Sequence, residues 1–243
     1  YDTFDVSQVK RVEDLPVWDK GCDSSYTWAK KYKHLMGQAT TSELADRVTD
    51  ILKNESNPKG LFLHPVSGQH QHLCITGGEP LMPQSQQAFV GMYRELERRG
   101  NLPSSITFET NGTQTLTDEF KDLISSVHTE IFFSVSPKLW TVAGERREKA
   151  IKPETVAEYA QHSPNGQLKF VVGNQDEQWT DMEEVLKLFR DAGVDYPVWI
   201  MPVGAREEEQ SDTAGDVARR AFQRGYNVAA RVHVHLFGNL IGT

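Results

Sequence analysis

The sequence has few cysteines, no long apolar run and no excess of positive charge. Its two cysteines, Cys22 and Cys74, are too few for a framework of disulfides. No apolar run approaches the length that crosses a membrane and no signal-peptide pattern opens the chain, so we expect a cytoplasmic protein without membrane contact. The net charge of −8 disfavours nonspecific binding to nucleic acid, because that binding needs basic patches.

Nothing in the sequence divides the chain. It has no internal repeat, no low-complexity tract and no linker rich in proline or serine. A hydrophobic content of 38%, a charged content of 25% and a mean hydropathy of −0.53 are typical of a soluble globular protein. With 243 residues the chain can form one large core. We therefore expect a single domain over residues 1–243.

Hydrophobic periodicity predicts that helices and strands alternate along most of the chain. The first expected helix covers residues 40–54, because Thr40 and Glu43 have the spacing of a capping box. Strands are predicted at 72–76, 105–109, 131–135, 168–172, 198–201 and 228–235. Helices are predicted between them at 84–99, 117–126, 153–161, 180–192 and 212–224. This order implies an α/β fold with a parallel sheet and right-handed crossovers.

The stretch Thr76-Gly77-Gly78-Glu79-Pro80 ends the first of these strands. Ligands of parallel sheets and barrels gather at the carboxyl ends of the strands. The paired glycines would let a ligand approach the backbone, and the carboxylate of Glu79 beside them would suit an amino group. A Gly-Gly pair can also be a simple turn from strand to helix, so the remaining strand ends decide between these two interpretations.

Polar residues also follow the second and third strands. Glu109 ends the second, and Ser134, Ser136 and Lys138 end or follow the third. For Glu109 and for Thr76, bonds to nearby loop backbone are an equal alternative to a role in a site. Lys138 could be a solvated surface lysine or could lie near an anionic group of a ligand. The ordered placement of these residues predicts one large site at the mouth of a barrel.

Lys169 lies inside a strand pattern, which favours a paired or site-facing lysine and also raises Schiff-base catalysis as an alternative. His233 and His235 would share one face of the last predicted strand. Since no third metal ligand accompanies them, we expect one histidine to bind substrate and the other to be structural. Cys74, in an apolar run, is expected to be a buried small hydrophobic residue.

Five motifs in order resemble a family of radical S-adenosylmethionine enzymes, the 7-carboxy-7-deazaguanine synthases. They are Cys-Asp-Ser-x-Tyr-Thr-Trp from Cys22, Thr-Gly-Gly-Glu-Pro-Leu from Thr76, Glu-Thr-Asn-Gly-Thr from Glu109, Ser-Val-Ser-Pro-Lys from Ser134 and Arg-x-His-x-His from Arg231. Gly-Gly-Glu-Pro marks the superfamily, and the first and fourth motifs are more specific to the synthases. The resemblance runs from Cys22 to about Asn239.

The resemblance implies a partial (βα) barrel of the radical S-adenosylmethionine type with mostly parallel strands. It also implies a carbon–nitrogen lyase that contracts the ring of 6-carboxy-5,6,7,8-tetrahydropterin to give 7-carboxy-7-deazaguanine with loss of ammonia. The protein of such an enzyme positions and secludes a radical. By the same resemblance we expect a homodimer that receives electrons from a flavodoxin or ferredoxin.

The resemblance also implies the residues of the site. S-adenosylmethionine would be bound by residues of the first and third strand ends: Gly77, Gly78, Glu79, Ser134, Ser136 and Lys138. The pterin substrate would touch three residues: Thr76, Glu109 and His235. Cys22 would bind a [4Fe–4S] cluster, and Ser24, which replaces a usual threonine, would help to hold Mg²⁺.

The sequence departs from the family in its cysteines. The family holds its cluster with three, of which only the last is matched, by Cys22. One cysteine cannot anchor a cluster. Either a cysteine-bearing segment is missing before Cys22, where Lys20-Gly21 runs abruptly into the motif, or the protein binds a pterin or nucleoside without radical chemistry. We favour the first because the other motifs are retained. A third hypothesis is an aldolase-like barrel with Lys138 or Lys169 as the Schiff base.

Overall fold

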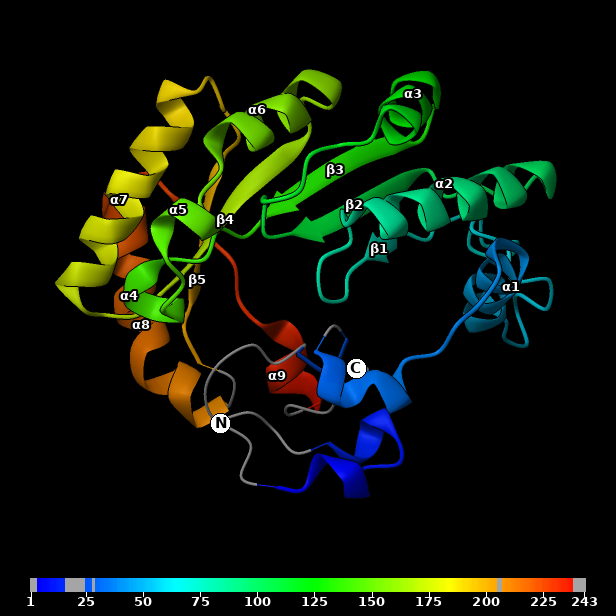
Figure 1. The fold of residues 1–243 in the computed structure, drawn as a ribbon, viewed down its shortest axis with the longest axis horizontal. Coiled ribbons are helices and arrows are strands. Elements are labelled where there is room, and N and C mark those ends of the chain that lie inside the picture. Colours follow the sequence, from blue (N-terminus) through cyan, green and yellow to red (C-terminus); the bar gives the residue numbers. More distant parts are fainter. Residues whose placement is uncertain (1–3, 16–24, 28, 205–206, 238–243) are drawn as a thin grey trace.

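A computed structural model describes residues 4–15, 25–27, 29–204 and 207–237 of the chain (Figure 1). Its centre is a sheet of six strands in the order β1-β2-β3-β4-β5-β6, and every neighbouring pair is parallel. The strands are β1 (Leu73–Ile75), β2 (Ser105–Thr110), β3 (Glu130–Val135), β4 (Gly166–Val172), β5 (Val198–Pro202) and β6 (Asn227–Val228). The predicted α/β partial barrel with mostly parallel strands is confirmed.

Helices connect the strands, as parallel pairing requires. The α-helices are α1 (Thr41–Leu52), α2 (Pro83–Arg98), α3 (Asp118–Ser126), α4 (Trp140–Ala143), α5 (Arg147–Ala150), α6 (Pro153–His162), α7 (Asp176–Asp191), α8 (Glu207–Gln223) and α9 (Val232–Phe237). Short 3₁₀ helices lie in the N-terminal part at Val6–Gln8, Val12–Asp14, Ser25–Thr27 and Lys30–Leu35. None of the helices in the described part of the chain has the length and apolar character needed to cross a bilayer.

Local sequence signals fix where these helices begin. Thr40 and Glu43 form the predicted capping box at the start of α1, because each side chain accepts a backbone hydrogen bond from the other residue. Pro83 opens α2, at a position where the missing N–H costs nothing. The hydroxyl of Thr117 accepts a bond from the Phe120 N–H at the start of α3. The helix ends therefore satisfy donors that the helices themselves leave unpaired.

The helices α2, α3, α6 and α7 lie on the outer side of the curved sheet, whereas α9 lies on its inner side (Figure 1). The core fills the space beneath the outer helices, where Phe108 and Phe133 of neighbouring strands stack with their ring centres 5.9 Å apart. Phe89, Phe120 and Tyr159 from the helices pack on these two rings. A second, smaller cluster in the N-terminal part contains Val9, Leu15 and Tyr32.

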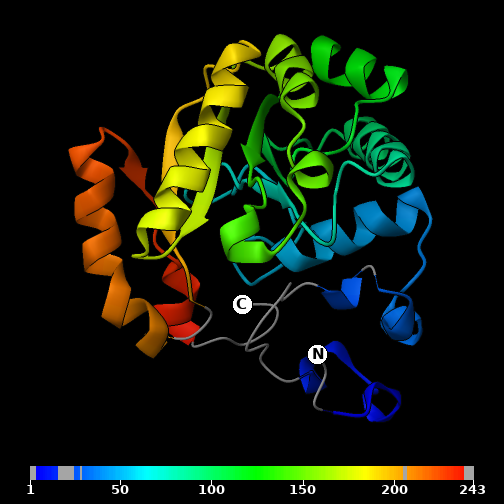
Figure 2. The ribbon, with the colours of Figure 1, turned by 60° about the vertical axis from the view of Figure 1, so that its left-hand side comes forward.

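The helices α7 and α8 stand side by side at the end of the sheet near β5 (Figure 2). The guanidinium groups of Arg220 and Arg224 lie over the ring of Trp179, 5.0 and 4.8 Å from its centre. Trp179 is buried, and its indole N–H donates to the carbonyl of Gly173. These cation–π contacts join α7 to α8 near β5, the last long strand of the sheet.

The predicted strand over 228–235 is wrong. The strand β6 has only two residues, Asn227 and Val228, and the chain then forms the helix α9. The alternation of Val232, His233, Val234 and His235 suggested a strand, but so short a window also fits one turn of helix. In this helix Val234 is buried whereas Val232 is exposed. His233 and His235 therefore do not share a strand face.

The prediction that Cys74 is buried is also wrong, because Cys74 is exposed. Its strand, β1, is an edge strand of three residues. The side chain of Cys74 lies on the side of the sheet that the outer helices do not cover, opposite Thr107 in the register of β1 and β2. An apolar run of this length does not reveal which of its residues face the core.

Gly166 offers a test of the packing between β4 and the loop before β5. A methyl group at this position would lie 2.4 Å from the ring of Tyr196, which is buried and donates a hydrogen bond to the carbonyl of Ser163. We expect Gly166→Ala to lower the free energy of unfolding by about 1 to 3 kcal/mol in urea titrations. Gly215→Ala is the control, because Gly215 lies within α8 with space around it. This substitution should raise the free energy of unfolding by about 0.5 to 1 kcal/mol. Equal stabilities of the two variants would contradict this packing.

Candidate functional site

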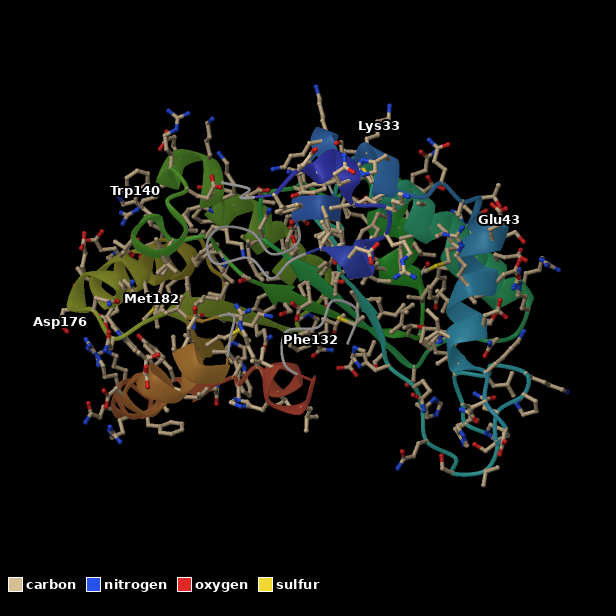
Figure 3. All side chains as sticks on the ribbon, turned by 90° about the horizontal axis from the view of Figure 1, so that it is seen from below. Lys33, Glu43, Phe132, Trp140, Asp176 and Met182 are labelled. Carbon is tan, nitrogen blue, oxygen red and sulfur yellow. The ribbon has the colours of Figure 1, made fainter. Side chains whose placement is uncertain are left out.

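The candidate site lies on the inner face of the sheet, which we define as the face away from the outer helices. Along β2, β4 and β5 every second residue is buried, and the residues between them are only partly covered. The partly covered residues of these strands are Ser105, Thr107, Glu109, Gln167, Lys169, Val171, Trp199 and Met201. Figure 3 shows the molecule from below, with Phe132 of β3 near the middle of the view.

An ion pair between Glu109 and Lys169 crosses the inner face from β2 to β4. The Lys169 ammonium donates to both carboxylate oxygens of Glu109, at 2.9 Å to Oε1 and 2.8 Å to Oε2. The Lys169 side chain is only 11% exposed, whereas that of Glu109 is 40% exposed. The carboxylate is therefore open to a ligand on one side while the lysine supports it from the other.

Ser134 of β3 lies between these two strands and joins the same network. Its hydroxyl donates to Glu109 Oε1 at 3.3 Å and accepts from Gln167 Nε2 at 2.9 Å. Ser134 is buried, in register with Glu109 on one side and Gln167 on the other. Hydrogen bonds thus tie together polar side chains from three adjacent strands, and they converge on the carboxylate of Glu109.

Further toward the amino ends of the strands, the same face carries His72 and Cys74. Both nitrogens of the His72 ring are engaged, with Thr107 Oγ1 at 2.8 Å and Ser105 Oγ at 3.0 Å. Partial desolvation raises the pKa of the Cys74 thiol; the Glu109 carboxylate raises it further, whereas Lys169 acts in the opposite direction. Because the thiolate and not the thiol is the metal ligand, this environment disfavours metal binding by Cys74.

Glu79 ties the first strand end to the second. Its Oε1 accepts from the Thr110 hydroxyl at 2.6 Å and from the Leu81 N–H at 3.0 Å, and its Oε2 accepts from the Asn111 N–H at 2.9 Å. Burial raises the pKa of Glu79, while these hydrogen bonds and the charge of Lys138 act against that rise. Since a carboxylate accepts about four hydrogen bonds, Oε2 keeps one site for a ligand donor.

The backbone around Glu79 leaves room for a ligand. Gly77 has a φ of 102°, and apart from its own chain neighbours no described residue comes within 4 Å of where its side chain would begin. Gly112, by contrast, has a φ of 78° and no such room, because a side chain would meet Val135 and Val156. Gly112 therefore lies in closely packed backbone, and Gly77 is the glycine beside an open space.

The predicted residues that the structure describes fall into two groups. Gly77, Gly78 and Glu79 lie at the end of β1, close to the end of β3, where the Ser136 N–H donates to the Thr110 carbonyl at 2.7 Å and Lys138 is exposed. On the inner face lie Glu109 and Ser134, with Thr76 exposed just after β1. Ser134, predicted with the cofactor group, thus contacts Glu109 of the substrate group.

His235 lies on α9, the helix on the inner side of the sheet, and its side chain is exposed. Cys22 and Ser24, predicted as metal ligands, lie outside the described residues. Among the residues that are described, no group of three or more histidine, cysteine, aspartate or glutamate side chains is arranged to hold a metal ion.

Sequence reasoning missed Gln167 and Trp199. Gln167 bonds to Ser134, and Trp199 is the register partner of Lys169 on β5. The signal was present for Trp199, which lies within the predicted strand 198–201, whereas Gln167 lies one residue before the predicted strand 168–172 and shares the alternate positions of Lys169 only in the longer strand observed. Further site residues can therefore be sought at the strand positions that face the same side of the sheet as a known functional side chain, both in its own strand and in the neighbouring strands.

No family model matches the chain. The chain is 28% identical over 233 residues to a 7-carboxy-7-deazaguanine synthase of Pyrobaculum aerophilum. The matched region covers 96% of this chain and 86% of the relative. The chain is also 28% identical over 183 residues to a protein of the same name from Rhodopirellula baltica, covering 71% of this chain and 64% of that relative. Among solved structures, SuiB of Streptococcus suis matches 87% of this chain and 47% of its own length, with a TM-score of 0.46 and 14% identity.

The raised pKa of Glu79 predicts a pH dependence of stability. Because the folded protein holds this proton more tightly than the unfolded chain, the contribution of Glu79 is fully present below the ordinary pKa of 4.5 and is lost as the pH rises through the raised value. The free energy of unfolding of wild type minus that of Glu79→Gln should therefore fall with rising pH. Urea titrations from about pH 3.5 to about pH 7.5 measure this difference.

Glu95 provides the opposite control. Hydrogen bonds from Arg98 and Arg99 lower the pKa of Glu95 to about 2, so its contribution is present above the ordinary pKa and is lost as the pH falls. The free energy of unfolding of wild type minus that of Glu95→Gln should thus fall as the pH is lowered. A Glu79 difference that stays level, or that follows the trend of Glu95, contradicts the burial of this carboxylate.

Proposed function

We propose, from the premise that this chain is a homologue of the 7-carboxy-7-deazaguanine synthases along 96% of its length, that it binds a carboxylated pterin on the inner face of its sheet. The reaction we propose is the ring contraction of 6-carboxy-5,6,7,8-tetrahydropterin to 7-carboxy-7-deazaguanine with loss of ammonia. The enzyme would be a carbon–nitrogen lyase. The observation that carries the proposal is the carboxylate of Glu109, fixed by Lys169 and Ser134 and open to a ligand.

A pterin suits this carboxylate chemically. The pyrimidine half of the ring carries a 2-amino group, and its N–H bonds point in the ring plane toward an acceptor. A carboxylate held in one orientation accepts such a donor with a charge-assisted hydrogen bond. Trp199 and Phe132 on the same face supply apolar surface of the kind that lines small-molecule sites. Thr76 and His235 remain proposed contacts of the pterin.

We propose that S-adenosylmethionine binds at the end of β1. Oε2 of Glu79 keeps a lone pair for an ammonium group, and Gly77 leaves the backbone accessible beside it. We propose that Gly78, Ser134, Ser136 and Lys138 complete this site. In radical enzymes this cofactor supplies the abstraction of a hydrogen atom. The part of this chain would be to orient the cofactor and the pterin toward each other at the carboxyl end of the sheet.

The residues of this chain do not fit a [4Fe–4S] cluster. A cluster bound through three cysteines needs three thiolates, and the sequence has only Cys22 and Cys74. Cys74 lies on β1 with a raised pKa, beside the carboxylate of Glu109. The complete reaction therefore requires thiolate ligands beyond those of this sequence. The proposed roles of Cys22 in a cluster and of Ser24 in binding Mg²⁺ stay predictions.

The cysteine count favours a second candidate function, a homologue that binds the pterin or a related nucleoside without radical chemistry. A Schiff-base lyase that uses Lys169 is disfavoured, because a Schiff base forms from a neutral amine and Lys169 forms an ion pair with Glu109. The same hypothesis with Lys138 stays a prediction. A homodimer and an electron donor such as flavodoxin or ferredoxin remain part of the first proposal only, since the second needs no electrons.

Binding of oxidised pterin-6-carboxylate tests the shared part of both candidates without any cofactor. Isothermal titration calorimetry should show binding to the wild-type protein and a Kd roughly 10- to 100-fold higher for Glu109→Gln, because a hydrogen bond to a charged group contributes about 1.5 to 3 kcal/mol. Glu119→Gln is the matched control, since Glu119 forms an exposed ion pair with Arg94 on the outer helices. Absence of binding, or equal weakening by the two substitutions, would contradict the site.

Anaerobic reconstitution separates the two candidates. Protein from the complete gene should turn brown with iron and sulfide, and it should release 5′-deoxyadenosine only when dithionite and S-adenosylmethionine are both present. With the tetrahydropterin added, 7-carboxy-7-deazaguanine should form. A colourless protein that still binds the pterin would favour the second candidate and overturn the first.

A further inference from the structure

We propose that Lys169 is the positioning residue that sets the selectivity of the site for an amino group at C2 of the pteridine. This inference rests on the proposed function, because it assumes a pteridine at Glu109. Lys169 would act through the carboxylate of Glu109 and would not touch the ligand itself.

The Lys169 ammonium forms two hydrogen bonds with one carboxylate. They join it to Oε1 and Oε2 of Glu109 at 2.9 and 2.8 Å, so that the carboxylate is gripped at both oxygens. Lys169 extends from β4 and Glu109 from β2, two strands away. A glutamate side chain without such a partner can rotate about three bonds, and the grip removes most of that freedom. The orientation of the carboxylate is thus set by a residue on another strand.

The number of hydrogen bonds then shows which part of Glu109 is open to a ligand. Oε1 accepts from Lys169 and, in a long bond of 3.3 Å, from Ser134. Oε2 accepts from Lys169 alone among the hydrogen bonds seen in the described residues. Since each carboxylate oxygen accepts about two bonds, Oε2 has a lone pair to offer. That lone pair is the acceptor that we assign to the exocyclic amino group.

Burial distinguishes the roles of the two side chains. Glu109 is 40% exposed and can meet a ligand, whereas Lys169 is only 11% exposed. Ser134, itself buried, is held in turn by Gln167 at 2.9 Å, so that the support of Oε1 is also fixed. The open carboxylate is therefore backed by the largely buried ammonium of Lys169 and the buried hydroxyl of Ser134.

A fixed lone pair discriminates between two substituents at C2. A 2-amino group donates a hydrogen bond to it, whereas a 2-oxo group presents its own lone pairs and is repelled. A site built to accept one N–H rejects an analogue without it, because the site's polar group is then left unpaired. If the carboxylate is released from Lys169, it can move away from either substituent, and the selectivity falls.

The experiment compares pterin-6-carboxylate, which has the 2-amino group, with lumazine-6-carboxylate, which has a 2-oxo group. The wild-type protein should bind the pterin roughly 10- to 100-fold more tightly in titration calorimetry. Lys169→Met should reduce this ratio to within about three-fold. Lys169→Arg should keep it, because a guanidinium also donates two bonds to one carboxylate. Lys187→Met, which removes a lysine from an exposed ion pair with Asp191, should leave it unchanged.

The outcomes are distinct. A wild-type protein that binds neither ligand refutes the proposed function itself. A wild type that prefers the pterin, with an equal loss of affinity for both ligands in Lys169→Met and an unchanged ratio, overturns only the role of Lys169. Should Lys169→Met fail to fold by circular dichroism, Lys169→Gln takes its place, because its amide keeps one donor and should give an intermediate ratio. An unchanged ratio in Lys169→Gln likewise overturns the inference.

Discussion

Alternate side chains of a strand point to opposite faces of a sheet, and in this protein the outer helices cover only one of them. Every strand must therefore place apolar residues on one side, as β2 does with Ile106 and Phe108. The residues between them face the opposite side of the sheet, away from the core, and can therefore carry charged side chains. This constraint puts the residues with chemistry on the inner face, and the carboxyl ends of the parallel strands gather the loops at one edge of it.

The ion pair of Glu109 and Lys169 is difficult to explain by stability alone. Desolvation of two charges offsets much of their attraction, and apolar residues of similar size would often serve the fold equally well. The pair also reaches from β2 across β3 to β4, and Ser134 and Gln167 are hydrogen-bonded into the same network, which makes its geometry specific. A charged group held in one orientation at modest exposure is what a ligand site needs. We therefore interpret the pair as part of the binding machinery.

Much of the fold could be predicted from the sequence, because hydrophobic periods and caps act over short distances. The capping box at Thr40 and Glu43 and the five longer strands illustrate this. The pairing of Glu109 with Lys169 could not be predicted, because it depends on strand order and register between segments 60 residues apart. The errors at 228–235 and at Cys74 have a similar origin, since a short pattern does not determine which side the core lies on.

Our proposal of a small planar ligand on the inner face is based on the similarity to the 7-carboxy-7-deazaguanine synthases and on the position of Glu109, whereas the cysteines do not supply a cluster. The central claim is thus the place of the ligand. A crystal structure of the protein with pterin-6-carboxylate bound tests it most directly. The account predicts that the pteridine lies on the inner face, with its 2-amino group within hydrogen-bond distance of Glu109 Oε2. A pteridine bound elsewhere, with the ion pair of Glu109 and Lys169 untouched by it, would contradict the account.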